Sequence, residues 1–127
     1  MKTVRKTDPP ISDERGSITN ILDVDFPLRS ILLITSKAGT VRANHYHMTD
    51  SHYVYLLNGK MEYTEKDMKG KNQRKRSVIV EPGDLIFSPP MVAHAMRFLE
   101  NTVFLAFTTE PRDQRSYEKD TVRIKLI

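Results

Sequence analysis

Four histidines carry the clearest chemical signal in this sequence of 127 residues, which contains no cysteine. His45 and His47 stand two residues apart, and alternation along a β-strand places residues at that spacing on one face. His52 opens the next apolar run, and His94 opens a later one. Neutral imidazole binds zinc, iron, manganese, nickel or copper, and four imidazoles buried without a metal are costly to charge. We therefore predict one divalent transition metal held by His45, His47, His52 and His94.

The same strand faces supply candidate pocket residues. Met61 and Tyr63 alternate along the run after Asn58-Gly59, and Met96 and Phe98 alternate after His94. Tyr63 is the candidate general acid or base, although a tyrosine on an apolar face also suits a purely structural position. A metal-bound imidazole is a poor base because its lone pair is committed to the metal.

Short strands must position these residues, because runs of Val, Ile, Leu, Phe, Tyr and Thr alternate with Gly and Pro. No window of ten or more residues has a helical apolar period. Asn58-Gly59 predicts a two-residue hairpin turn, and Val41 and Ala43 are expected to face inward with the histidines. We predict an all-β fold, an antiparallel β-barrel or jelly roll formed by a single domain over 1–127. The expected strands are 17–22, 29–36, 41–47, 52–57, 60–65, 77–80, 84–88, 93–99, 103–108 and 121–126.

Composition and charge narrow the class of protein further. Hydrophobic residues make up 39% and charged residues 28%, which is ordinary for a globular protein and argues against disorder. The net charge is +4, and the basic segment 66–76 contributes Lys69, Lys71, Arg74, Lys75 and Arg76. This segment lacks interleaved aromatic residues, so we interpret it as a solvated hairpin tip and predict no nucleic-acid partner.

Other features of the sequence bear on the cellular location of the protein and on whether it forms a dimer. The first residues have no apolar core of a signal peptide, and the longest aliphatic run, 31–34, is far too short to span a membrane. We expect a cytoplasmic protein without a membrane partner. Strands expected at both chain ends could pair across a homodimer. The carboxylates Asp13, Glu14, Asp23 and Asp25 are interpreted as turn and surface residues rather than as a glycosidase pair.

Two long motifs resemble those of the cupin family. In the first, spanning 39–59, Gly39 precedes His45-Tyr46-His47 by five residues, and His52 and Gly59 follow at the family's intervals. In the second, spanning 83–98, Gly83 precedes Pro89-Pro90-Met91, and His94 and Phe98 follow at the usual spacing. This resemblance implies a cupin barrel.

Three positions depart from the cupin pattern. His52 stands where the family usually has a glutamate, which gives an all-histidine ligand set with one or two positions open for water or substrate. Met91 stands where a turn glycine is usual, so we expect the loop there to adopt a different φ. Phe98 stands in place of an asparagine that is not a ligand.

A narrower likeness connects the chain to cupins of nucleotide-sugar metabolism. The segments 13–16, 41–45, 112–113 and 117–120 resemble those of keto-sugar 3,5-epimerases and sugar 3,4-ketoisomerases. In the epimerases an arginine three residues before the histidine lies in the active site, and Arg42 holds that position. Strict alternation would turn Arg42 outward, so this role requires a β-bulge. Those epimerases are generally metal-independent, whereas four histidines favour a metal here.

Three functions remain open from the sequence. The first is a metal-binding isomerase or epimerase of a sugar or sugar nucleotide, in which the metal would act as a Lewis acid. The second is a metal-dependent dioxygenase or oxidase of a small organic substrate. The third is a non-catalytic module that binds a sugar or metabolite. In each case the partner is a small molecule, and Arg42, Met61, Met96 and Phe98 are the predicted pocket residues.

Overall fold

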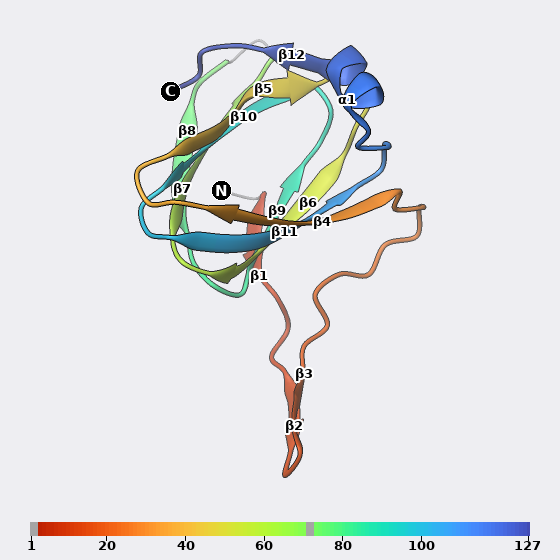
Figure 1. Cartoon of the computed structure of the whole chain (residues 1–127), viewed down its shortest axis with the longest axis vertical. Helices are drawn as coiled ribbons and strands as arrows, with labels where there is room; N and C mark the ends of the chain where they lie inside the picture. Colours follow the sequence, from red (N-terminus) through yellow and green to blue (C-terminus); the bar gives the residue numbers. More distant parts are fainter. Residues whose placement is uncertain (1–2, 71–72) are drawn as a thin grey trace.

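Two antiparallel sheets face one another and form a flattened barrel (Figure 1). A computed structural model describes residues 3–70 and 73–127. One sheet has the strand order β1-β9-β6-β11-β4 and the other β12-β5-β10-β7-β8. From β4 to β11, consecutive strands alternate between the two sheets except for β7 and β8, which pair with each other, and this is a jelly-roll arrangement. The all-β prediction is confirmed.

Most element bounds agree with the expected strands to within a residue or two. The strands β1 and β2 and the helix α1 were not predicted, and the first and last expected strands are shorter than expected. The elements are β1 (Val4–Lys6), β2 (Ile11–Asp13), β3 (Gly16–Ile18), β4 (Ser30–Ser36), β5 (Val41–His47), β6 (His52–Asn58), β7 (Met61–Asp67), β8 (Arg76–Val80), β9 (Asp84–Ser88), β10 (Val92–Phe98), β11 (Thr102–Thr108), α1 (Gln114–Asp120) and β12 (Thr121–Arg123).

The core lies between the two sheets. Alternate residues of the strands point inward and pack as one apolar cluster, which buries area that would otherwise contact water. Its fully buried members include Leu56, Met61, Tyr63, Phe98 and Phe104, and Phe98 stacks on Phe104 with ring centroids 5.8 Å apart. This cluster fills one end of the barrel, so any cavity must lie toward the other end.

The turn at Asn58-Gly59 joins the two sheets instead of closing a hairpin. β6 pairs with β11 and β9, whereas β7 pairs with β10 and β8. Gly59 has φ +102°, and a Cβ there would lie 2.5 Å from the carbonyl oxygen of Asn101. The hairpin prediction is wrong because this turn packs against the loop before β11, which only a glycine allows.

A β-bulge interrupts β5 immediately before the histidines. His94 pairs with His45 and Ala95 pairs with Ala43, so Asn44 is the extra residue. Ala43 and Asn44 have positive φ values of 71° and 56°. The bulge reverses the alternation on its N-terminal side. Val41 is consequently 40% exposed instead of facing inward, which corrects the sequence expectation.

Met91 also adopts a left-handed conformation, with φ 65°. The expectation that this loop would differ in φ from one with glycine is therefore wrong. Two backbone hydrogen bonds fix the residue, because its N–H donates to the carbonyl of His47 at 2.8 Å and its carbonyl accepts from Met68 N–H at 2.9 Å. These bonds tie the loop before His94 to the end of the strand that carries His45 and His47.

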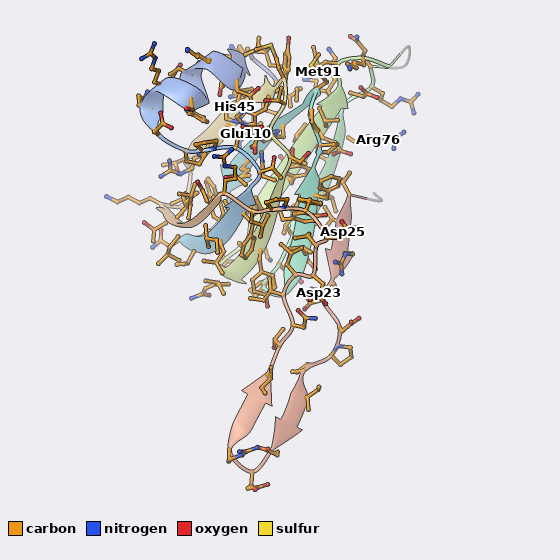
Figure 2. The ribbon with its side chains drawn as sticks, turned by 90° about the vertical axis from the view of Figure 1, so that its right-hand side faces the viewer. Asp23, Asp25, His45, Arg76, Met91 and Glu110 are labelled. Atoms are coloured by element: carbon orange, nitrogen blue, oxygen red, sulfur yellow. The ribbon has the colours of Figure 1, made fainter. Side chains whose placement is uncertain are left out.

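Other segments lie outside the barrel. The β2–β3 hairpin projects from it as an arm in both views (Figures 1 and 2). Asp23 and Asp25 lie near the base of this arm, away from His45 (Figure 2). Gln73 to Arg76 are exposed, as expected for a hairpin tip, while Lys71 falls outside the described residues. Within the described chain, no helix is long and apolar enough to cross a membrane.

Candidate active site

A cavity of about 140 Å³ opens between the sheets at the end near α1. Its apolar floor comes from the core strands, and its rim carries imidazoles, two guanidinium groups and a phenol. The lining residues are Ile34, Arg42, Ala43, His45, His47, His52, Val54, His94, Met96, Phe104, Ala106, Thr108, Arg112 and Tyr117. All four histidines of the chain therefore meet in one cavity.

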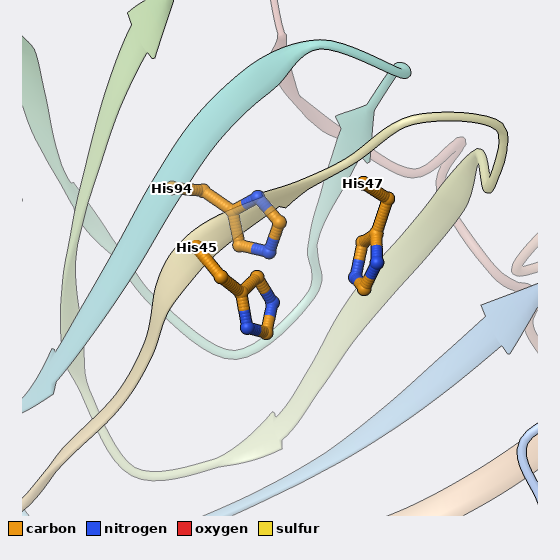
Figure 3. Close-up of side chains that lie close together, drawn as sticks. All are labelled: His45, His47 and His94. Atoms are coloured by element: carbon orange, nitrogen blue, oxygen red, sulfur yellow. The ribbon is translucent and has the colours of Figure 1, made fainter. Parts of the chain in front are cut away.

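The histidine rings come from three strands and pack against one another at tilted to perpendicular angles. His45 and His47 lie on β5 with ring centroids 4.6 Å apart, and His94 on the paired strand β10 lies 4.8 Å from His45 (Figure 3). His52, at the start of β6 in the opposite sheet, lies 4.9 Å from His94 and 5.4 Å from His47. The cluster thus bridges the two sheets.

Each ring has its Nδ1 atom beside a polar group outside the cluster. Nδ1 of His45 lies 3.4 Å from the Tyr117 hydroxyl, and that of His47 lies 3.3 Å from the Thr121 hydroxyl. Nδ1 of His94 lies 3.1 Å from the Ser88 hydroxyl, and that of His52 lies 3.0 Å from Asp50 Oδ2. This arrangement is typical of metal-ligating histidines, in which one nitrogen is oriented by a hydrogen bond and the other is left for the ligand.

Two buried or nearly buried aspartates organise the loop between His47 and His52. Asp50 Oδ1 accepts hydrogen bonds from the N–H and hydroxyl of Thr109 and from Glu110 N–H, which leaves Oδ2 to His52. Asp120, at the end of α1, accepts from Met48, Thr49 and Asp50 N–H at 2.7–3.1 Å. The two carboxylates therefore fix the backbone that joins the two histidine-bearing strands.

Burial favours the neutral form of three of the imidazoles, His45, His47 and His94. Desolvation, followed by the charges of neighbouring histidines, lowers the pKa of His45 from 6.5 to about 3. Desolvation also lowers the pKa of His47 to about 4 and that of His94 well below its usual value. Burial opposes ionisation of Asp50, yet hydrogen bonding from His52 and the adjacent imidazoles hold the pKa of Asp50 below its usual value. Neutral imidazoles are the form that binds metals.

The residues fit a metal ion, and the structure gives a group of three histidines and a second group that contains the fourth. His45, His47 and His94 each offer a ligand atom within 4.8 Å of the others, whereas His52 groups with His47 and Asp50. The Nε2 atom of His47 is buried and has no hydrogen-bond partner among the described residues. An orphaned buried nitrogen is costly unless a ligand satisfies it, so the three-histidine set is suited to a metal.

The structure separates the predicted pocket residues into two groups. Arg42 and Met96 line the cavity, and Arg42 does so because of the bulge that follows it. Met61, Tyr63 and Phe98 do not line the cavity, because they are fully buried in the apolar cluster beneath it. Desolvation also raises the pKa of the Tyr63 phenol far above its usual value, so this residue is poorly suited to proton transfer.

Four residues of the site were not among the predicted ones. Tyr117 and Arg112 reach the cavity from α1 and the segment before it, with the Arg112 guanidinium 4.2 Å from the centre of the Tyr117 ring. Asp50 and Asp120 support the histidines from outside. A capping aspartate three residues before Ser116 could have indicated the short helix, since Asp113 Oδ1 accepts from Ser116 N–H. No periodic signal indicated where the helix would pack.

Comparison with known protein families matches residues 32–108 to the cupin domain. This match covers more than half of the chain, so the protein belongs to the cupin family. No curated protein matches the sequence.

Solved structures similar to this chain include two sugar 3,4-ketoisomerases and a 3,5-epimerase. The QdtA 3,4-ketoisomerase of Thermoanaerobacterium thermosaccharolyticum, a double mutant in complex with TDP, superposes with a TM-score of 0.75 at 25% identity, covering 97% of this chain and 88% of that one. A dTDP-4-dehydrorhamnose 3,5-epimerase from Sulfolobus tokodaii gives 0.77 at 16% identity, covering 94% and 75%. The Campylobacter jejuni TDP-fucose-3,4-ketoisomerase gives 0.72 at 20% identity, covering 94% and 87%.

Proposed function

We propose that this cupin is a metal-binding isomerase or epimerase of a sugar nucleotide. The observation that carries the proposal is the composition of the cavity. Neutral imidazoles, a phenol and two guanidinium groups converge there, and no carboxylate is among its described lining residues. Such a site suits a substrate with a reactive carbonyl and an anionic tail. The similarity to ketoisomerases and epimerases supports the same class.

The size and charge of the cavity suggest which part of the substrate it holds. Its volume of about 140 Å³ is well below the roughly 300–1,000 Å³ of pockets that enclose a whole ligand. We infer that the sugar ring enters and the nucleotide stays outside. Arg42 and Arg112 flank the cavity, and their fixed positive charge suits a diphosphate. Arg42 is held in place by hydrogen bonds from its Nε to Ser36 Oγ and from its Nη2 to the Thr35 carbonyl.

His52 is the proposed base. Ionised Asp50 can only accept, so the His52 Nδ1 next to it carries the proton, which leaves the lone pair on Nε2. His52 lines the cavity and is not among the three imidazoles whose ligand atoms all lie within 4.8 Å of one another, so we propose that its lone pair is not committed to a metal. It can therefore remove a proton from the carbon beside a sugar carbonyl and return it to the neighbouring carbon from the same face. Inversion at the first carbon would require a second proton donor on the opposite face of the ring.

Tyr117 is the proposed proton donor. Its hydroxyl lies at the cavity beside His45, and the Arg112 guanidinium packed over its ring holds the phenol at the rim. A proton from this hydroxyl to the carbonyl oxygen would trap the enol that forms when His52 acts. Tyr117 takes the role that the sequence suggested for Tyr63.

The proposed metal ligands are His45, His47 and His94. A bound divalent ion would act as a Lewis acid toward the sugar carbonyl. The identity of the metal is not specified by three imidazoles, which suit zinc, iron, manganese, nickel and copper. Metal analysis of protein purified without a nickel column is expected to give about one ion per chain, and a His94→Ala variant should retain far less. Metal-free protein that remains metal-free after reconstitution would contradict this assignment.

The working unit that we propose is a homodimer. The two strands nearest the chain ends, β1 and β12, each lie at the edge of a sheet. Edge strands have free backbone groups on one side, which is where another chain can pair.

Solvent exchange tests the proposed reaction. A TDP-linked 4-keto-6-deoxy sugar is incubated with the enzyme in deuterium oxide and followed by proton NMR. We expect deuterium at the carbon next to the carbonyl together with an isomerised or epimerised product. Tyr117→Phe should lower kcat by on the order of 100-fold, whereas the matched change Tyr63→Phe should leave it nearly unchanged. Saturable binding without exchange or product would instead indicate a non-catalytic binding module.

A further inference from the structure

Asn44, the extra residue of the β5 bulge, holds the backbone of residues 124–127. Its Oδ1 accepts hydrogen bonds from Leu126 N–H and Ile127 N–H, both at 3.1 Å, and its Nδ2 donates to the Ile127 carbonyl at 3.4 Å. The backbone carbonyl of Asn44 accepts from Ile124 N–H at 3.0 Å. Asn44 therefore binds three residues that follow β12, and we call these four hydrogen bonds the clasp.

The bulge itself does not require the side chain of Asn44. This residue has φ 56°, a left-handed conformation that glycine adopts freely and that asparagine tolerates better than most residues. Glycine would therefore form the same backbone and keep Arg42 turned into the cavity. Every side-chain hydrogen bond that Asn44 makes among the described residues goes to residues 126 and 127. The amide group thus serves the clasp and not the bulge.

The segment held by the clasp packs on the outer face of the histidine-bearing sheet. Leu126 is buried with Ala93 and Ala95, the two neighbours of His94 on β10. Lys75 Nζ also donates to the Leu126 carbonyl at 2.9 Å. Neighbouring residues of a strand face opposite sides of its sheet, so Leu126 lies behind the strand whose inner face carries the His94 imidazole. The segment is therefore anchored to the strands that carry the candidate metal ligands.

The helix α1 depends on its connections for its position. It has seven residues and none of them is buried, and a helix this short is marginal on its own. β12 follows α1 directly and pairs with β5 over only three residues (Figure 1). The clasp begins at the residue after β12, so it keeps this short pairing from fraying. It thereby fixes the element from which Tyr117 reaches the cavity.

We propose that Asn44 is a positioning residue for Tyr117, an inference that rests on the proposed function, in which Tyr117 donates the proton. Asn44 acts through the clasp, β12 and α1, and it does not contact the reacting atoms. The Tyr117 hydroxyl lies 3.4 Å from Nδ1 of His45, the residue that follows Asn44. The bulge that turns Arg42 inward therefore also anchors, through one amide group, the segment that carries the phenol.

Two substitutions separate the side chain from the bulge. Asn44→Gly keeps the left-handed backbone and removes three of the four hydrogen bonds of the clasp, whereas Asn44→Asp keeps an oxygen that accepts from Leu126 and Ile127. The matched control is Asn101→Gly. Asn101 Oδ1 accepts from Ala38 N–H at 2.9 Å, so it also holds a loop, but this loop precedes β5 instead of following β12.

Proton NMR without substrate or metal reads the position of Tyr117 directly. The centroid of its ring lies 6.1 Å from that of His45 and 5.7 Å from that of His47, so we expect nuclear Overhauser effects between these rings. The effects should fall by at least half in Asn44→Gly, be largely retained in Asn44→Asp and be unchanged in Asn101→Gly. Full-strength effects in Asn44→Gly, or effects in Asn44→Asp as weak as those in Asn44→Gly, would overturn the proposal.

Turnover of the TDP-linked keto sugar tests the consequence for the proposed reaction. Asn44→Gly should lower kcat about tenfold, because a displaced phenol no longer meets the carbonyl oxygen. Asn44→Asp should recover most of this loss, and Asn101→Gly should equal the wild type. An unchanged kcat in an Asn44→Gly protein whose Tyr117 has moved would refute the positioning role. If the wild type itself shows no turnover, the proposed function fails, while the NMR result still decides whether Asn44 positions Tyr117.

Discussion

At the scale of single residues, the group behind each imidazole determines what that imidazole can do. Three rings face hydroxyl groups of Tyr117, Thr121 and Ser88, and the fourth, His52, lies 3.0 Å from Asp50 Oδ2. His47 Nδ1 also lies 3.8 Å from a carboxylate oxygen of Asp120. The Thr121 hydroxyl donates to the Tyr117 carbonyl, and the Val92 carbonyl lies 3.3 Å from His94 Nδ1, so these partners favour a proton on Nδ1 of His47 and His94. The ionised carboxylate of Asp50 can only accept, so it commits His52 to one tautomer. A buried carboxylate also raises the basicity of the imidazole beside it, and this is the physical basis for proposing His52 as the base.

Asp50→Asn should therefore abolish the function of the base while keeping the fold. Thr109 and Glu110 present three donors to Asp50 Oδ1, so the amide oxygen of asparagine must stay on that side. The NH₂ group then faces His52, whose Nδ1 must accept and whose Nε2 takes the proton. We expect kcat to fall by on the order of 1,000-fold.

Nitrogen NMR of the histidines checks the cause of this loss. The spectrum should show His52 change from the Nδ1–H to the Nε2–H tautomer, which a merely structural defect would not produce. Asp113→Asn, an exposed capping change, is the matched control and should leave both kcat and the His52 tautomer as they are. A fall in kcat with the Nδ1–H tautomer retained would contradict the proposed role of Asp50.

At the scale of elements, the connections between strands decide which side chains meet. The notable case is Gly59, which combines φ +102° with a close approach to Asn101 and Thr102. Gly39 has φ +86°, but a Cβ added there would meet nothing within 4 Å. The two glycines therefore separate backbone strain from steric overlap, because only Gly59 has both.

Alanine at these two positions should have unequal costs. Gly39→Ala carries only the left-handed strain, which lowers the free energy of unfolding by about 1 kcal/mol. Gly59→Ala must in addition displace the backbone of the loop before β11, so we expect a loss of roughly 2–4 kcal/mol. Urea denaturation of both variants measures the difference. If both variants lose the same free energy of unfolding, the loop before β11 can move away from the new Cβ without loss of stability.

The bulge in β5 and the turn after β6 show where sequence reasoning stops at this scale. Alternation predicted the limits of β5 and the pairing of His45 with His47 on one face. It could not place the extra residue, because a bulge depends on the partner strand, here the register of β10 against Ala43 and His45. Asn58-Gly59 predicted a tight turn correctly but not its partner strands, because local preferences contain no information on which sheet the next strand joins.

At the scale of the whole molecule, the fold and the gathering of the histidines were predictable and the rim of the cavity was not. The histidines lie in regular strands, so spacing alone indicates that His45, His47 and His94 face one interior. Tyr117, Arg112 and Asp120 reach the same place from a short C-terminal segment whose position depends on tertiary packing. Tyr63 was chosen because it faces inward, yet the interior at that depth is filled by the side chains of Met61, Phe98 and Phe104.

Burying several neutral imidazoles in one molecule also makes its stability depend on pH. His45 and His47 have pKa values of about 3 and 4 in the folded chain, and burial lowers that of His94 as well, whereas each is near 6.5 when unfolded. Between about pH 6.5 and 4 the unfolded chain binds protons that the folded chain excludes. The free energy of unfolding must then fall as the pH falls, by up to about 1.4 kcal/mol per pH unit for each histidine.

Urea denaturation at several pH values between 7 and 4.5, with a chelator present throughout, measures this slope without a contribution from bound metal. The wild-type protein should be most stable above pH 6.5 and should lose stability progressively below it. His45→Asn removes one group that titrates only in the unfolded chain, so its slope should be shallower by up to about 1.4 kcal/mol per pH unit. A wild-type stability that stays constant from pH 6.5 to 4.5 would mean that the folded and unfolded chains bind the same number of protons. That result would contradict the lowered pKa values of the buried imidazoles.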